Sequence, residues 1–156
     1  MSGMTIALVT QLCLLGGEPD TYAAAHRVTT ETGKPLMVMV STEWCPPCQT
    51  MKKSVIPQVR QRGTLDKVAF AVVNPDNDRE LAQQLTGGGP VPQLVIYRRG
   101  PFGWARRKLI GGQSVEGVER FINQAIADDA AERQAAKQKQ DDDKHAATPQ
   151  PEDPKT

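Results

Sequence analysis

The feature that most restricts the possible folds of this chain is a pair of cysteines, Cys45 and Cys48, placed directly after a continuous apolar run. They lie in the segment Trp44-Cys45-Pro46-Pro47-Cys48, and the run occupies residues 36–40. An apolar run of this length is typical of a strand buried on both faces. Because the pattern from Pro47 onward is helical, we expect the two cysteines at a strand-to-helix turn.

Strand and helix patterns alternate along the rest of the chain. We expect strands over residues 36–40, 68–73, 94–97 and 104–110, and helices over 19–33, 47–53, 78–85 and 114–127, with a helical or irregular piece over 55–61. Strands separated by helices predict parallel crossovers, whereas the short loop between the last two strands predicts an antiparallel pair. The chain is therefore expected to be α/β, with a mixed sheet of four or five strands and helices on both faces.

The folded part is expected to be one domain over residues 18–127. The first seventeen residues include a short apolar stretch, residues 4–15, which is too short for a membrane span of roughly twenty residues. Residues 1–17 are read either as a signal peptide, with cleavage near Gly16 and Gly17, or as an N-terminal extension that packs as a strand or helix. The first alternative predicts an exported or periplasmic protein, and the second a cytoplasmic one.

The last part of the chain, residues 128–156, is rich in Ala, Gln, Asp, Lys and Pro. We expect a charged, largely disordered tail, of which the part to about Gln140 could extend the preceding helix into solvent. The whole chain has a formal net charge of +1, with 19 basic and 18 acidic residues. This balance gives no electrostatic reason to bind nucleic acid or a membrane surface, and we expect a monomer.

The chemistry of the chain is expected at its two neighbouring cysteines. A sulfur at a helix N-terminus is stabilised as a thiolate by unpaired N–H groups and the helix dipole. Cys45 would attack a substrate disulfide, and Cys48, one turn behind and less exposed, would resolve the mixed disulfide. Pro46 and Pro47 stiffen the ring but remove two N–H donors. Trp44 would shield the sulfur pair with an apolar contact.

Other uses of the cysteines remain open. The pair could be a static disulfide, a pair of buried thiols, or two soft ligands for copper. Cys13 is a lone third cysteine, so the chain is not a disulfide-stapled scaffold. A zinc site would need more ligands than His26 and His145 supply, and Gln49 after Cys48 excludes a c-type haem site. We expect no metal and no cofactor.

A basic cluster surrounds the loop between the last two expected strands. It is formed by Arg98, Arg99, Arg106, Arg107 and Lys108. We interpret it as a solvated sheet edge that discourages strand pairing, with a docking surface for an acidic partner as the alternative.

Three segments resemble the thioredoxin superfamily. Residues 41–48 look like its active-site signature, and residues 91–94 look like its cis-proline loop. The third segment, Ile110-Gly111-Gly112, matches the segment that the family has before its last helix. The resemblance covers about residues 19–127 and implies a thioredoxin fold. It also implies a thiol–disulfide oxidoreductase that acts on protein disulfides or dithiols with an unidentified redox partner. Residues 32–35 and 51–57 look more like the thioredoxin-related, often exported, subgroup.

The resemblance assigns roles to Val91 and Pro92. It implies that Pro92 is cis and lies against the cysteine pair, and that Val91 offers backbone groups to an extended substrate segment. Two departures concern proton transfer, because many thioredoxins keep a buried acid and a lysine where this chain has Met39 and Val72. Proton transfer at Cys48 is then left to water, Glu43 or the substrate. A non-catalytic binding module with a static disulfide is the main rival function.

Overall fold

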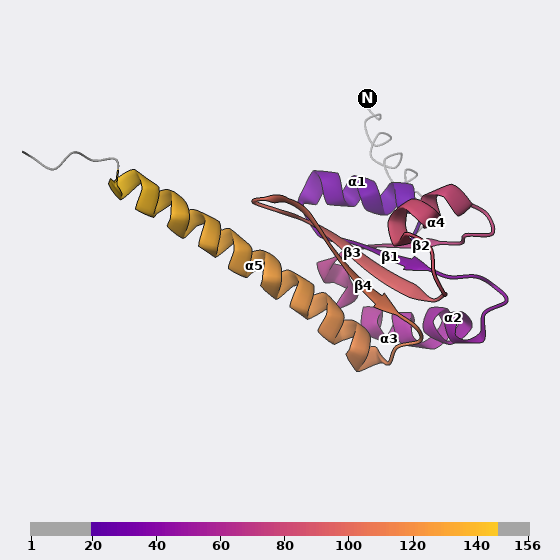
Figure 1. The fold of residues 1–156 in the computed structure, drawn as a ribbon. Coiled ribbons are helices and arrows are strands. Elements are labelled where there is room, and N and C mark those ends of the chain that lie inside the picture. Colours follow the sequence, from indigo (N-terminus) through magenta and orange to yellow (C-terminus); the bar gives the residue numbers. More distant parts are fainter. Residues whose placement is uncertain (1–19, 147–156) are drawn as a thin grey trace, which may run out of the picture.

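A four-stranded mixed sheet forms the centre of the computed structural model, which describes residues 20–146 (Figure 1). Its strands are β1 (Leu36–Val40), β2 (Ala69–Val73), β3 (Gln93–Gly100) and β4 (Gly103–Ile110), in the order β2-β1-β3-β4. β1 and β2 are parallel, whereas β3 is antiparallel to both β1 and β4. The expected α/β class and mixed sheet are confirmed, with four strands in the described residues.

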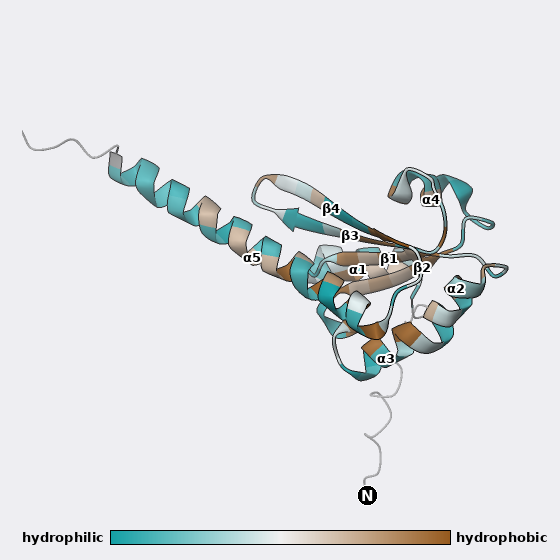
Figure 2. Ribbon diagram, turned by 60° about the horizontal axis from the view of Figure 1, so that its bottom comes forward, coloured by the Kyte–Doolittle hydropathy of each residue, from teal (hydrophilic) through white to brown (hydrophobic). Residues whose placement is uncertain are grey.

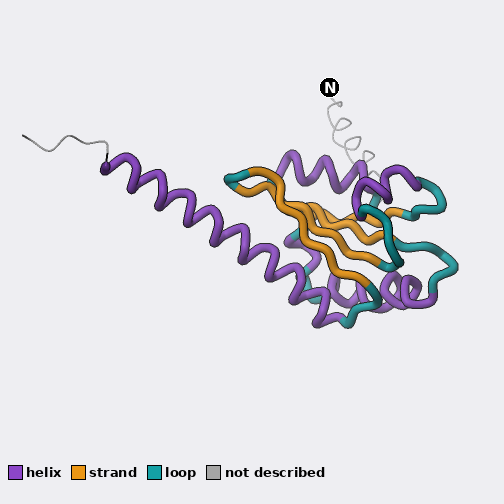
Figure 3. Tube along the Cα trace, viewed as in Figure 1, coloured by secondary structure: helices purple, strands orange, loops and turns teal. Residues whose placement is uncertain are grey.

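Helices cover both faces of the sheet. One face carries α1 (Tyr22–Thr32) and α4 (Arg79–Thr86), and the other carries α2 (Pro46–Thr50), η1 (Met51–Val55), α3 (Ile56–Gln61) and α5 (Val115–Ala146) (Figures 1 and 3). A short 3₁₀ turn, η2 (Leu65–Lys67), precedes β2. All five residues of β1 are buried, because this strand has a neighbour on each side and a helical layer on each face.

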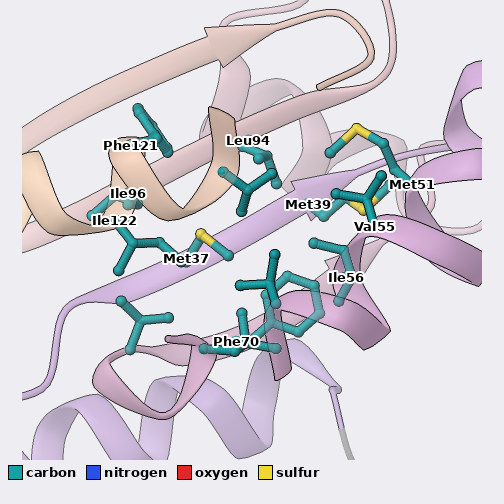
Figure 4. Close-up of a cluster of buried hydrophobic side chains, with 14 of the residues drawn as sticks. Met37, Met39, Met51, Val55, Ile56, Phe70, Leu94, Ile96, Phe121 and Ile122 are labelled. Atoms are coloured by element: carbon teal, nitrogen blue, oxygen red, sulfur yellow. The ribbon is translucent and has the colours of Figure 1, made fainter. Parts of the chain in front are cut away.

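The alternating side chains of the strands divide the core into two clusters. Met37 and Met39 of β1 point to the α5 side, where they pack with Phe70, Leu94 and other residues (Figure 4). The cluster on the other face is built on β1 and β2 and is covered by α1 and α4. In Figure 2 the hydrophobic colour lies on the strands of the sheet and on stretches of α3 and α5.

The start of α1 and the helix junction at Pro57 differ from the expectation. Thr21, not Asp20, caps α1, because its hydroxyl accepts the Ala24 N–H at 3.3 Å. Asp20 instead has a positive φ, and its carboxylate accepts two hydrogen bonds from Arg60. The expected break at Pro57 is a passage from the π-helical η1 into α3, since proline has no N–H for the regular helical bond.

After residue 127 the described chain is helical, as allowed to about Gln140, and the disorder expected from Asp141 is not found before residue 147. α5 continues to Ala146 and extends beyond the sheet (Figure 1). Its extension is held by long-range ion pairs: Arg98 of β3 binds Glu132, and Arg107 of β4 binds Asp128. Three residues of the basic cluster therefore have partners: these two arginines, and Lys108, whose ammonium group donates to the Thr86 carbonyl. These pairs join residues 21 and 34 positions apart, so local composition did not reveal them.

Some expectations concern residues outside the described range. The proposed signal peptide or extension at 1–17, Cys13, and residues 147–156 all lie there. Among residues 20–146, no helix has the length and apolar character needed to cross a bilayer.

Candidate functional site

The two cysteines lie at the start of α2, at the end of the sheet where the loops after β1 and β2 and the loop before β3 meet (Figure 3). They form a disulfide, with their Cα atoms 5.2 Å apart. Cys45 has extended backbone dihedrals and is the N-cap of α2, while Cys48 lies in its first turn. The strand-to-helix turn expected from the apolar run therefore brings both sulfurs to a helix tip.

The two prolines leave one backbone donor for the first sulfur. Pro46 and Pro47 occupy the first two positions of α2 and have no N–H. The N–H of Cys48 is the first available, and it donates to Cys45 Sγ at 3.3 Å. The sulfur thus takes the place that a serine or aspartate oxygen takes in an ordinary N-cap.

The two sulfurs differ in their access to solvent. Cys45 is 5% exposed and Cys48 is fully buried. Pro46, Pro47 and Trp44 next to them are exposed, and α5 runs away from this end of the sheet (Figure 1). A molecule that approaches the disulfide therefore meets Cys45 first.

The loop before β3 lies against the first cysteine. The Val91–Pro92 peptide bond is cis, and the carbonyl oxygen of Val91 is 3.7 Å from Cys45 Sγ. The side-chain amide of Gln93 donates to the carbonyls of Gly88 and Pro90, which fixes the loop from within. The cis form implied by the resemblance is therefore present.

Trp44 lies at the rim of the site and is 71% exposed. Its indole N–H donates to Asp76 in the loop after β2 at 3.0 Å. Trp44 and Asp76 line an open hollow of about 530 Å³ together with Thr42, Arg79 and Val91. The link from Asp76 to Trp44 was not predicted from the sequence, because the two residues lie 32 positions apart.

Glu43 is engaged by its own neighbours. Its carboxylate binds the ammonium group of Lys52 and accepts a hydrogen bond from the side-chain amide of Gln49. Hydrogen bonds from Lys52 and then Gln49 hold the pKa of Glu43 below its usual range. Glu43 is therefore an ionised, exposed side chain with its oxygens in use.

The core beside α2 is apolar at the two positions singled out in the sequence. Met39 is fully buried, and its register partner on β2 is Val72. Both pack in the cluster that contains Met51, which follows Cys48 by three residues. Within residues 20–146, no three His, Cys, Asp or Glu side chains come together as a possible metal site.

Comparisons with known proteins agree with this geometry. A family model described as thioredoxin-like matches residues 18–98. A thioredoxin from Thermus thermophilus has a similar structure, with 22% identity and a TM-score of 0.59 over 69% of this chain and 85% of that chain. A Trichomonas vaginalis thioredoxin has 19% identity and a TM-score of 0.52 over 69% of this chain and 98% of that chain.

Trxlp from Edwardsiella tarda is also similar, at 25% identity and a TM-score of 0.52 over 67% of this chain and 95% of that chain. These likenesses confirm the expected thioredoxin fold. A comparison with curated proteins found no match.

Proposed function

Because the chain belongs to the thioredoxin-like family, we propose that it is a thiol–disulfide oxidoreductase that exchanges disulfides with protein substrates through Cys45 and Cys48. The observation that carries this proposal is the position of Cys45 Sγ. It caps a helix, accepts the Cys48 N–H and lies beside the cis Val91–Pro92 loop. A sulfur held in this way is stabilised as a thiolate, which is the reactive form.

The exchange proceeds in two steps when the pair is reduced. The Cys45 thiolate attacks one sulfur of a substrate disulfide, a mixed disulfide forms, and the other substrate sulfur leaves as a thiolate. Cys48 then loses its proton and attacks Cys45 Sγ, which releases the second substrate thiolate and restores the intramolecular disulfide. The substrate gains two electrons and the cysteine pair loses them. The reverse sequence oxidises a substrate dithiol.

Burial supports this division of roles. Cys45 is the more exposed sulfur, and Cys48 is enclosed one turn behind it. An extended substrate segment that reaches Cys45 would pass Val91, whose carbonyl faces the sulfur. Backbone pairing at Val91 and contact with Trp44 across the hollow would hold that segment in place.

Proton removal at Cys48 has no assistance from a buried acid. The Met39 and Val72 positions are apolar, and Glu43 is occupied at the surface by Lys52. Water or the leaving substrate thiolate is then the proton acceptor. We therefore propose a slower second step than an enzyme with a buried acid would have, which suits a specialised redox partner better than a general reductase.

The low exposure of the cysteines favours a second candidate, a binding module whose disulfide is static. Insulin reduction with dithiothreitol as electron donor separates the two. We expect turnover by the wild type and loss of it in Cys45→Ser. Activity that persists in Cys45→Ser would exclude Cys45 as the nucleophile. A wild-type disulfide that stays oxidised under these conditions would favour the binding module.

A further inference from the structure

The exposed large apolar side chains of the described residues form two groups at opposite ends of the β3–β4 hairpin. Trp44 and Ile110 lie at the end that carries the cysteines, while Phe102 and Trp104 lie at the hairpin tip. Phe102 is 76% exposed and Trp104 is 59% exposed. Trp44 has a role in the proposed function, whereas the group at the hairpin tip has none. Exposed aromatic side chains gathered at one place mark interaction surfaces.

The hairpin tip extends past the rest of the sheet. β1 pairs with β3 only as far as Tyr97, so residues 98–105 form a two-stranded ribbon. Alternation along the strands places Arg98 and Arg107 on one face of the ribbon, where they bind Glu132 and Asp128 of α5. The same alternation places Arg99, Trp104 and Arg106 on the opposite, outward face.

The arginines on one face of the ribbon have acidic partners, whereas those on the other face have none. On the α5 face, acidic side chains neutralise the arginines. On the outward face, Arg99 and Arg106 are exposed, and their side chains make no hydrogen bond or ion pair with another described residue. Arg99 lies directly across from Trp104 in the strand register, and Arg106 is two residues away on the same strand. The outward face thus presents an aromatic ring flanked by two unpaired guanidinium groups, with no acidic residue in the ribbon.

A hollow of about 480 Å³ lies beside this surface, between the hairpin tip and α5. Phe102 and Pro101 form one wall, and Ala136 and Lys137 of α5 form the other. Lys137 adds a cation without a partner among the described residues, and Asp143 lines the outer end of the hollow. A ligand in this hollow would meet the apolar side chains of Phe102 and Ala136 beside the ammonium group of Lys137.

From this arrangement we propose that the hairpin tip, defined by Arg99, Phe102, Trp104 and Arg106, is a docking surface for an acidic segment of a partner protein. Paired guanidinium groups bind carboxylates in a forked geometry, and the two aromatic rings supply apolar contact area. Two free arginines and a net charge of +1 fit a short acidic peptide better than a nucleic acid, which would need a longer row of phosphate contacts. The eight residues of β3 separate this surface from the cysteines by about 25 Å, so a docked partner leaves them accessible.

Binding of a synthetic probe tests the proposal. The probe is a fluorescein-labelled decapeptide of alternating glutamate and leucine, and its counterpart alternates lysine and leucine. In a Trp44→Phe background, Trp104 is the remaining tryptophan and reports on the surface directly. We expect the acidic peptide to bind, to change Trp104 fluorescence and to be released by salt, while the basic peptide does not bind.

The decisive comparison is between two charge-reversal variants of equal net charge. Arg99→Glu/Arg106→Glu should weaken binding about tenfold or more, because two attractions become repulsions. Lys53→Glu/Arg120→Glu reverses two exposed cations elsewhere and should leave binding unchanged. Circular dichroism confirms folding of both, and insulin reduction should be unchanged in the first variant, so this result is independent of the redox proposal.

Several outcomes would overturn the proposal. One is equal affinity of both charge-reversal variants for the acidic peptide, and another is the absence of binding by the wild type. Tighter binding of a single-stranded oligonucleotide at the same salt concentration would assign the surface to nucleic acid. Self-association tighter than peptide binding, abolished by Arg99→Glu/Arg106→Glu, would assign it to a second copy of this chain.

Discussion

Met39 of β1 and Val72 of β2 are register partners on neighbouring parallel strands, and both side chains belong to the apolar core beside α2. The Met39 side chain is fully buried. No acidic group is available at this position to take a proton from Cys48. The chemistry of the site therefore depends on the helix tip and on the groups that a substrate brings.

An acid placed at this position tests its importance. Met39→Asp should lower the free energy of unfolding by about 3 kcal/mol, because a carboxyl group without a partner replaces a buried thioether. At the same time it should speed the resolution of the mixed disulfide per folded molecule. Chemical denaturation and rapid-quench kinetics measure the two effects. Met39→Leu is the matched control. It should lower the free energy of unfolding by less than about 1.5 kcal/mol and leave the rate of mixed-disulfide resolution unchanged.

The hydrogen bond from Trp44 to Asp76 is expected to orient the indole ring beside the hollow that both residues line. Trp44→Phe and Asp76→Ala should each raise the KM for a protein disulfide several-fold, and the double variant should be no worse than either single one. Both side chains are exposed, so unfolding free energies should change by only about 0.5 kcal/mol. Additive effects in the double variant would show that the bond does not act as a unit.

Arg98 is the central residue of the ionic contact between the hairpin and α5. It is 6% exposed and is bound by Glu132, with Asp129 3.7 Å away. Arg98→Ala should lower the free energy of unfolding by about 2 kcal/mol. This is less than the cost of breaking a fully buried pair, because Glu132 is partly exposed. Amide hydrogen exchange should accelerate selectively in residues 128–146. Uniform acceleration across the sheet would instead mean that the contact supports the whole domain.

The same contact predicts a dependence on pH. Hydrogen bonds from Arg98 hold the pKa of Glu132 below its usual range. Because the folded-state pKa is the lower one, the stabilisation is present above the ordinary glutamate value of about 4.3 and is lost as the pH falls through the lowered value. Helicity at 222 nm should therefore decrease below about pH 4 as the α5 extension frays. The variant Glu132→Gln should lack this transition; an identical acid transition in it would contradict the assignment.

The parts of the fold that the sequence predicted are those with a local cause. The run from Leu36 to Val40 is apolar at every position, and it forms a central strand for that reason. Gly33, with a φ of 75°, ends α1 where a left-handed residue is needed. The two cysteines lie at the predicted helix tip because this strand leads directly into α2.

The contacts that were missed join distant parts of the chain. The helix beyond residue 127 is bound by Arg98 and Arg107, which belong to strands far away in the chain. The partner of Trp44 is Asp76, 32 residues later. Neither contact leaves a periodic signal, because each depends on which loops and strands the folded sheet brings together.

The central claim is that Cys45 is the sulfur that exchanges with a substrate and that Cys48 resolves the product. Trapping with an unfolded protein disulfide, followed by non-reducing electrophoresis and mass spectrometry, tests it most directly. Cys48→Ser should accumulate a mixed disulfide through Cys45, and Cys45→Ser should accumulate none. A mixed disulfide through Cys48 in Cys45→Ser, or no adduct in either variant, would contradict the account.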